Sequence, residues 1–174
     1  MRNINKLDFF VGVFLARIIN SSSSVPALFE ETENSKRIEF TTDTDDFNVY
    51  VKYSQRISTS SLKGRKKRSW TIGFSKNEYS ALKESFYSED RKNLICLVCT
   101  NQKLNETYLV VLSYKEAMKC LESNINGSRR ITVTRTGADH NFICYGAGPE
   151  MQRYSTKCPV DRAKSLGLKE EELV

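Results

Sequence analysis

The stretch Leu94–Thr100 has the sequence LICLVCT, and the stretch Thr107–Leu112 has the sequence TYLVVL. Each is a continuous apolar run of a length typical of a β-strand, without regular polar alternation. Strands with this pattern are usually covered on both faces, because side chains on each face must leave water. We therefore expect these two stretches to be strands of a sheet that carries other elements on both of its faces.

Three stretches nearer the N-terminus also have strand composition, Arg37–Thr42, Phe47–Ser54 and Trp70–Phe74. In the second of them apolar and polar residues largely alternate, which divides the side chains between two faces. One face would carry Phe47, Val49, Val51 and Tyr53, and the other would carry Asn48, Tyr50, Lys52 and Ser54. Gln55–Ser69 is rich in serine and then in lysine and arginine, and we expect it to be a long polar loop.

Two helices have clear start signals. Ser75–Glu78 and Ser113–Glu116 each place a serine at the N-cap and a glutamate three residues later, which is the spacing of a capping box. Apolar residues follow each signal at helical spacing. We expect the second of these helices to end at Asn126 and Gly127, because glycine commonly follows a helix C-terminus.

The C-terminal part contains one predicted hairpin and a charged end. Arg129–Thr136 and Asn141–Gly146 should pair around the turn GADH, and Val160–Val174 should be a short helix or a charged tail. The predicted fold is a single α+β domain over residues 1–174, with a central mixed sheet flanked by helices. Its expected element order is α-β-β-β-α-β, then β-α-β-β-α.

The N-terminal stretch admits two interpretations. Basic residues precede the apolar run FFVGVFLA, and SSSSVPA follows it, which is the outline of a signal peptide. Asp8 and Arg17 flank and interrupt the run, however, and its apolar residues recur at helical spacing. These residues are Leu7, Phe10, Val11, Phe14, Leu15 and Ile18. The periodicity favours an amphipathic helix that ends near Asn20, and the run is too short to span a membrane. We therefore expect a cytoplasmic protein with no membrane partner.

The positive charge is concentrated in one place. The formal net charge is +6, and Leu62–Arg68 carries five positive charges and no negative one. Subtracting those five charges from +6 leaves +1 for the rest of the chain. The five cations are Lys63, Arg65, Lys66, Lys67 and Arg68, and Trp70 follows them. Clustered cations contact phosphates and an aromatic ring stacks on bases, so this segment is the candidate nucleic-acid-binding element.

Several common catalytic and metal-binding patterns are missing from the sequence. The five cysteines are odd in number and irregularly spaced, and Cys96, Cys99 and Cys144 lie in apolar runs, which is typical of buried thiols in a reducing compartment. Cys96 and Cys99 form a CxxC pair, but residues three apart on a strand point to opposite faces, and no second pair completes a zinc site. His140 is the single histidine and lies in the predicted hairpin turn. The sequence also has no phosphate-binding glycine loop of the Walker or dinucleotide type.

The expected element order, with Lys52 on the second of three consecutive strands, resembles the PD-(D/E)XK superfamily of restriction-endonuclease-like nucleases. The resemblance covers about residues 5–100 and places the nuclease-like core within residues 1–100. In that family one strand carries an acid and the next carries an acid-x-lysine. The acids hold Mg²⁺, which activates a water, and the lysine orients the nucleophile. The resemblance therefore implies Mg²⁺ as the cofactor if the protein is a nuclease.

Carried over to this sequence, the resemblance implies catalytic roles for Glu39 and Lys52. Tyr50 occupies the position of the second acid, and a tyrosine that is protonated at neutral pH is a poor Mg²⁺ ligand. Asp46 or Asp45, from the preceding turn, would have to replace that acid. Glu30 and Glu31, after the first helix, are the other candidates.

Two functional hypotheses follow. The first is a nucleic-acid-associated domain on a restriction-endonuclease-like scaffold, catalytically degenerate or a Mg²⁺-dependent nuclease. The second is a non-enzymatic protein-interaction module such as a small regulator or inhibitor, because no complete catalytic set is present. Abundant Lys, Asn, Ser, Ile, Tyr and Phe fit an AT-rich bacterial or phage genome. Oligomeric state stays open, since the alternating strand could pair with another chain if it lies at a sheet edge.

Overall fold

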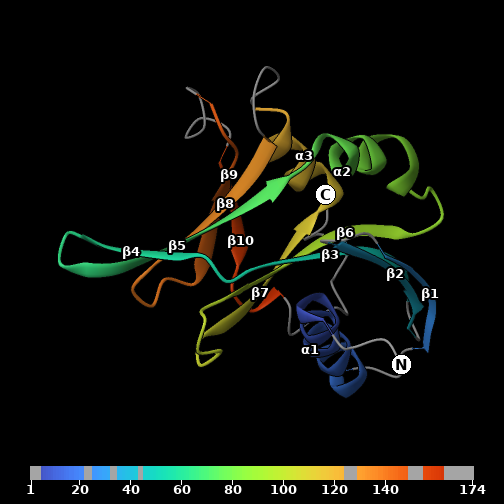
Figure 1. Ribbon diagram of the computed structural model, residues 1–174, viewed down its shortest axis with the longest axis horizontal. Helices are drawn as coiled ribbons and strands as arrows, with labels where there is room; N and C mark the ends of the chain where they lie inside the picture. The colour runs from blue at the N-terminus through green and yellow to red at the C-terminus, as the bar shows by residue number, and fades with distance from the viewer. Residues whose placement is uncertain are drawn as a thin grey trace.

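The computed structural model describes residues 5–21, 25–31, 35–42, 45–123, 129–148 and 155–162. Within these residues the strands form two five-stranded sheets, which we call sheet A and sheet B (Figure 1). The α+β class predicted from the sequence is confirmed. The arrangement of the strands differs from the expectation, because a second sheet packs where a single central sheet was predicted.

Sheet A contains the strands that the sequence marks most clearly. Its members, in spatial order, are β1 (Val25–Glu31), β2 (Ser35–Thr41), β3 (Asp46–Ser54), β6 (Lys92–Thr100) and β7 (Thr107–Ser113). Only β3 and β6 run parallel, with Val49 opposite Leu94. The other neighbours are antiparallel, so sheet A is mixed as predicted. β1 was not predicted from the sequence.

Helix α1 (Lys6–Ser21) covers one face of sheet A. Leu7, Phe10, Val11 and Phe14 are buried against Val49, Val51 and other side chains on that face. The periodicity therefore identified the packing stripe correctly, and the amphipathic-helix interpretation of this stretch is confirmed. No helix in the part of the chain that the structure describes is long and apolar enough to cross a membrane.

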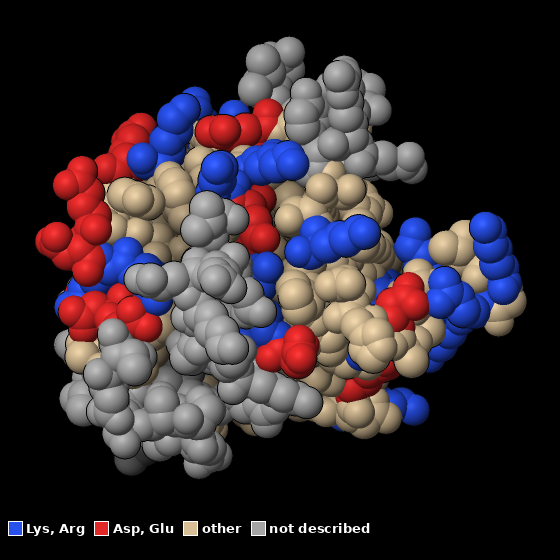
Figure 2. Space-filling model, turned by 180° about the vertical axis from the view of Figure 1, so that it is seen from behind, with Lys and Arg blue, Asp and Glu red and all other residues tan. Residues whose placement is uncertain are grey.

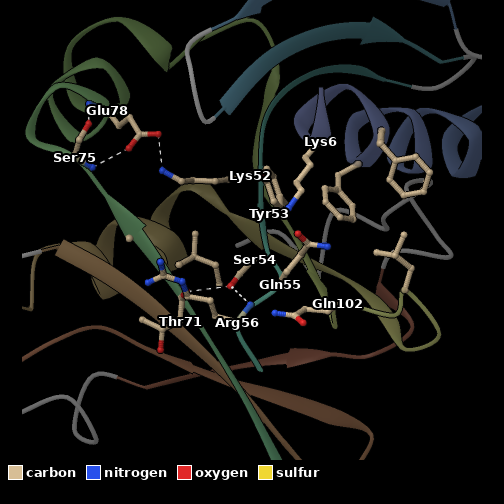
Figure 3. A pocket seen from close by; sticks show the side chains of 15 residues that line it. Lys6, Lys52, Tyr53, Ser54, Gln55, Arg56, Thr71, Ser75, Glu78 and Gln102 are labelled. Atoms are coloured by element: carbon tan, nitrogen blue, oxygen red, sulfur yellow. Dashed lines mark hydrogen bonds and ion pairs between the residues drawn. The ribbon is translucent and has the colours of Figure 1, made fainter. Parts of the chain in front are cut away.

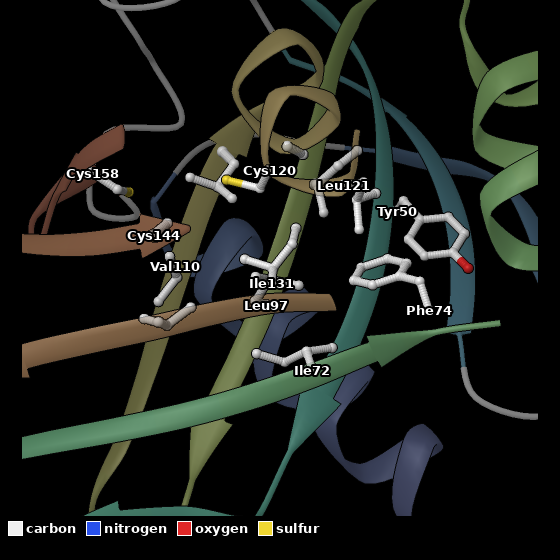
Figure 4. Close-up of a cluster of buried hydrophobic side chains, with 14 of the residues drawn as sticks. Tyr50, Ile72, Phe74, Leu97, Val110, Cys120, Leu121, Ile131, Cys144 and Cys158 are labelled. Carbon is white, nitrogen blue, oxygen red and sulfur yellow. The ribbon is translucent and has the colours of Figure 1, made fainter. Parts of the chain in front are cut away.

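Sheet B covers the opposite face of sheet A. Its members, in spatial order, are β10 (Thr156–Pro159), β9 (Asn141–Tyr145), β8 (Arg129–Thr136), β5 (Arg65–Phe74) and β4 (Ile57–Leu62). All of its neighbours are antiparallel. Tyr50 and Leu97 of sheet A and Ile72 and Ile131 of sheet B lie in one buried apolar cluster between the sheets (Figure 4). The hairpin of β8 and β9 was predicted, whereas β10 was not.

The predicted loop Gln55–Ser69 is mostly a β-hairpin. Within this stretch β4 pairs with the first half of β5, and Leu62 lies opposite Arg65. The two residues of its turn, Lys63 and Gly64, have φ angles of 50° and 75°. Positive φ at both central residues is what a tight type I′ turn requires. The prediction of a long loop was therefore wrong, and five strands rather than three lie between α1 and the next helix.

Both predicted capping boxes are present. Ser75 precedes α2 (Lys76–Ala81), which continues into the π-helical turn η1 (Leu82–Phe86), and Ser113 precedes α3 (Tyr114–Leu121). Each serine hydroxyl accepts from the backbone N–H three residues later, and each glutamate accepts from the serine N–H. Helix α3 ends before the predicted stop at residues 126 and 127, which lie outside the described residues. Residues 163–174 of the predicted terminal helix or tail also lie outside them.

Two glycines give a matched test of this packing. At Gly146, after β9, a Cβ would clash with the Cys120 carbonyl oxygen, whereas at Gly12 in α1 it would meet nothing within 4 Å. We expect Gly146→Ala to lower the free energy of unfolding by about 3 kcal/mol or more, because backbone must move. Gly12→Ala should raise it by about 0.5 to 1 kcal/mol, since alanine favours the helix. Urea denaturation measures both, and equal effects of the two substitutions would contradict the described contact.

Candidate functional site

The structure does not bring the predicted catalytic residues together. Glu39 accepts from Arg37 at 2.9 Å and lies 3.7 Å from Arg91. It is opposite Asn48 in the strand register, and Asn48 is four residues from Lys52, about 13 Å along β3. Asp46 lies farther away still, and its carboxylate accepts from the Thr41 hydroxyl at 2.6 Å. The acid and the lysine that the family resemblance assigned to one site therefore lie at different positions along β3.

These residues do not fit a Mg²⁺ ion. Among the described residues, no group of three or more histidine, cysteine, aspartate or glutamate side chains is placed to hold a metal. The carboxylate of Glu39 is already engaged by two arginines, and Asp45 pairs with Lys92 at 2.9 Å. Hard cations need several oxygen ligands on one site. We therefore derive no catalytic step through Mg²⁺.

Lys52 instead forms a buried ion pair with a residue from α2. Its Nζ lies 2.5 Å from Glu78 Oε1, and the two side chains are only 7% and 9% exposed. The ammonium also lies over the Phe74 ring, 4.7 Å from its centroid. Glu78 is the glutamate of the first capping box. Its carboxylate therefore caps the start of α2 and also pairs with the ammonium group of Lys52 on β3. The β3 face expected to be polar faces sheet B, which explains why Lys52 is buried rather than exposed.

Burial and ion pairing have opposite effects on the pKa values of Lys52 and Glu78. Desolvation lowers the pKa of Lys52 below its ordinary value, although the hydrogen bond and the attraction of Glu78 act to raise it. Burial alone would raise the pKa of Glu78, but hydrogen bonds from Lys52 and Ser75 outweigh it and hold that pKa below its ordinary value. We infer an ionised glutamate at neutral pH, stabilised by the lysine. The sequence marks Glu78 only as a capping residue, because its partner Lys52 lies 26 residues earlier, on a strand.

An open groove begins at this ion pair. It has a volume of about 1080 Å³ and lies between α1, the end of β3, β5 and the loop after β6. Figure 3 shows Lys52 and Glu78 at one end and Lys6, Arg56 and Gln102 farther along the groove. Among its described side chains, Lys6, Lys52 and Arg56 are cationic and Glu78 is the one carboxylate. The groove is therefore positively charged, although no spacing pattern in the sequence reveals it.

The predicted cationic segment lies at the tip of the hairpin formed by β4 and β5. Arg65 pairs with Asp139 at 2.8 Å, and Arg68 pairs with Glu106. Lys63, Lys66 and Lys67 have no carboxylate partner among the described residues. The five cations were predicted to act together, but two of them also hold the hairpin to neighbouring loops. Three lysines remain to attract an external anion.

Trp70 does not serve as a stacking platform. Its side chain is 0% exposed, and its indole N–H donates to the Thr100 carbonyl at 3.0 Å. The ring packs edge-on against Tyr108. The predicted base-stacking role is therefore wrong, because a core position between the sheets leaves no face of the ring open to a ligand.

Cys96, Cys99 and Cys144 are buried and His140 lies in a hairpin turn, as the sequence predicted. All five thiols are free and buried. Cys96 belongs to the cluster beneath α1 and Cys99 to the cluster between the sheets, so the CxxC pair points to opposite faces of sheet A. His140 lies exposed in the turn between β8 and β9. Neither feature assembles a catalytic or metal-binding group.

Comparison of this chain with protein-family models, with curated proteins and with solved structures found no match. Functional arguments therefore rest on the chain's own residues.

The pair of Lys52 and Glu78 can be tested by a double-mutant cycle. We expect Lys52→Met to lower the free energy of unfolding by about 3 kcal/mol, because it leaves a buried carboxylate without its partner. Adding Glu78→Gln should recover most of that loss, since glutamine keeps the capping position without the charge. Urea denaturation of the wild type, both single variants and the double variant measures the coupling. Additive losses would show that the two side chains do not stabilise each other.

The same carboxylate predicts a pH dependence. The pKa of Glu78 is lower in the folded protein than its ordinary value of 4.5, so the unfolded chain binds its proton first as the pH falls. The stabilisation from Glu78 is therefore complete above that value and is lost as the pH falls toward the folded pKa. We expect the stability difference between wild type and Glu78→Gln to be largest at neutral pH and to shrink at acidic pH. A difference that stays constant across this range would contradict the assignment.

Proposed function

We propose that this protein is a nucleic-acid-associated domain and that the hairpin of β4 and β5 is its phosphate-contacting element. The observation that carries the proposal is the set of three lysines, Lys63, Lys66 and Lys67, that lie on one projecting hairpin and have no carboxylate partner among the described residues. A cation without a carboxylate partner gains most from a phosphate, because no existing pair has to be broken.

The shape of the hairpin supports this assignment. Figure 2 shows lysine and arginine side chains gathered on the part of the molecule that corresponds to the projecting end of β4 and β5. Two-stranded ribbons of this kind can enter a nucleic-acid groove and place cations against the backbone. The β4 side chains opposite these cations are small, with Ser60 facing Lys67 and Ser61 facing Lys66. Small neighbours leave the lysine ammonium groups accessible.

The assignment of nuclease activity is not part of the proposal. The carboxylate nearest Lys52 belongs to Glu78, which is bonded to Lys52 and to the Ser75 backbone. Sequence-independent phosphate contact requires no such site, so the proposal concerns binding alone.

The salt dependence of binding tests the hairpin. Lys63, Lys66 and Lys67 would be changed together to glutamine, and a labelled short DNA duplex would be titrated between about 50 and 200 mM salt. We expect the slope of log affinity against log salt to fall in magnitude by up to about 2.7, because each lost phosphate contact contributes about 0.9. Fluorescence anisotropy measures the affinity at each salt concentration.

A matched variant controls for the loss of net charge. Lys76, Lys115 and Lys119 are exposed lysines on α2 and α3, and their replacement by glutamine removes the same charge elsewhere. We expect this variant to keep a slope close to that of the wild type. Equal slopes for the hairpin variant and the wild type would reject the proposal, as would purification of a stable protein complex that excludes nucleic acid from the hairpin.

A further inference from the structure

The groove beside Lys52 has the features of a ligand site in its own right. Two of its cations, Lys6 and Arg56, are exposed and have no carboxylate partner among the described residues. They come from different elements, since Lys6 begins α1 and Arg56 lies between β3 and β4. Two cations that line one groove without a carboxylate partner among the described residues favour an anion bound there.

The groove also presents apolar surface at its rim. Phe9 of α1 is 49% exposed and Leu104 of the loop after β6 is 42% exposed, and both line the groove. A phenylalanine in the first turns of a helix usually turns toward the core, as its neighbour Phe10 does here. An exposed aromatic ring beside unpaired cations fits a ligand that has both a flat ring and a negative charge.

Polar groups complete the lining. The side-chain amides of Gln55 and Gln102 line the same groove, and no side-chain hydrogen bond engages either of them among the described residues. An amide offers both a donor and an acceptor, which suits the edge of a nucleobase or a sugar hydroxyl. The volume of about 1080 Å³ lies at the upper end of the range of small-molecule sites, which is about 1,000 Å³.

The groove lies at the base of the hairpin that carries the lysines. Gln55 and Arg56 lead directly into β4, and Ile72 of β5 lines the groove. Lys66 is on the same face of β5 as Ile72 and lies six residues away, about 20 Å along the strand. That distance corresponds to about six stacked nucleotides, so one nucleic-acid strand can reach both places.

We propose that this groove binds one nucleotide, with its phosphate between Lys6 and Arg56 and its base against Phe9. Where the nucleotide is part of a strand, the proposal rests on the proposed function, and the hairpin holds the neighbouring phosphates. The ion pair of Lys52 and Glu78 lines one end of the groove, and the Glu78 carboxylate disfavours a second phosphate there.

Three variants and two probes test the proposal. The groove variants are Phe9→Ala and the pair Lys6→Gln with Arg56→Gln, and the hairpin variant is the triple lysine replacement described above. The probes are AMP, as a free nucleotide, and a labelled oligothymidylate. All substituted groove residues are exposed, so unchanged thermal midpoints are expected and would show that the variants fold.

We expect each groove variant to weaken oligothymidylate binding at least about fivefold, the lower end of what one base–aromatic stack contributes. Loss of AMP binding in the same variants would identify a free nucleotide as a sufficient ligand. Oligothymidylate binding that depends on the groove, without measurable AMP binding, would identify a nucleotide within a strand.

The failures of the two proposals are distinguishable. If the hairpin variant weakens binding and the groove variants do not, the groove proposal is wrong and the proposed function stands. If the groove variants alone weaken binding, the groove binds the nucleotide and the hairpin assignment is wrong. If wild-type protein binds neither probe, the groove proposal is overturned, and the duplex titration alone decides the hairpin proposal.

Discussion

The hydrogen bond from the Trp70 indole to the Thr100 carbonyl joins the two sheets across their shared core. A buried indole N–H must find an acceptor, and its partner here is the backbone at the end of β6. The bond therefore fixes where β5 crosses sheet A. On one side of Trp70 the strand contributes Ile72 and Phe74 to the core. On the other side it leaves the core and becomes the projecting hairpin, so the proposed phosphate contacts are carried by a strand that is anchored at its inner end.

Sequence reasoning succeeded where a residue pattern has one physical cause. The apolar stripe of α1, both capping boxes and the runs Leu94–Thr100 and Thr107–Leu112 are set by local burial or local hydrogen bonding, and all appear as expected. It failed for β4 and the start of β5, because a projecting hairpin buries little and needs no alternation of apolar residues. The exposed side chains of β4 give no strand signal that could be told from a polar loop.

The residues of the candidate sites were likewise predicted only where local sequence determines their role. The cationic segment was predicted because its charged residues are neighbours in the sequence. The buried environment of Lys52 was not predicted, because the sequence does not show that a second sheet covers the polar face of β3. Trp70 and Glu78 were misjudged or missed for a related reason: their roles depend on partners 30 and 26 residues away in the chain. Lys6, Phe9 and Arg56 meet at one groove only through the packing of α1 on sheet A.

The buried cysteines have a consequence of a different kind. Burial raises the pKa of all five thiols, that of Cys120 to about 12, so the reactive thiolate is almost absent from the folded protein. The residues are distributed over both faces of sheet A, helix α3 and sheet B. A modified thiol therefore marks a molecule whose interior has opened, and the position of that thiol tells which layer opened. Modification of the native cysteines therefore reports local unfolding without any added label.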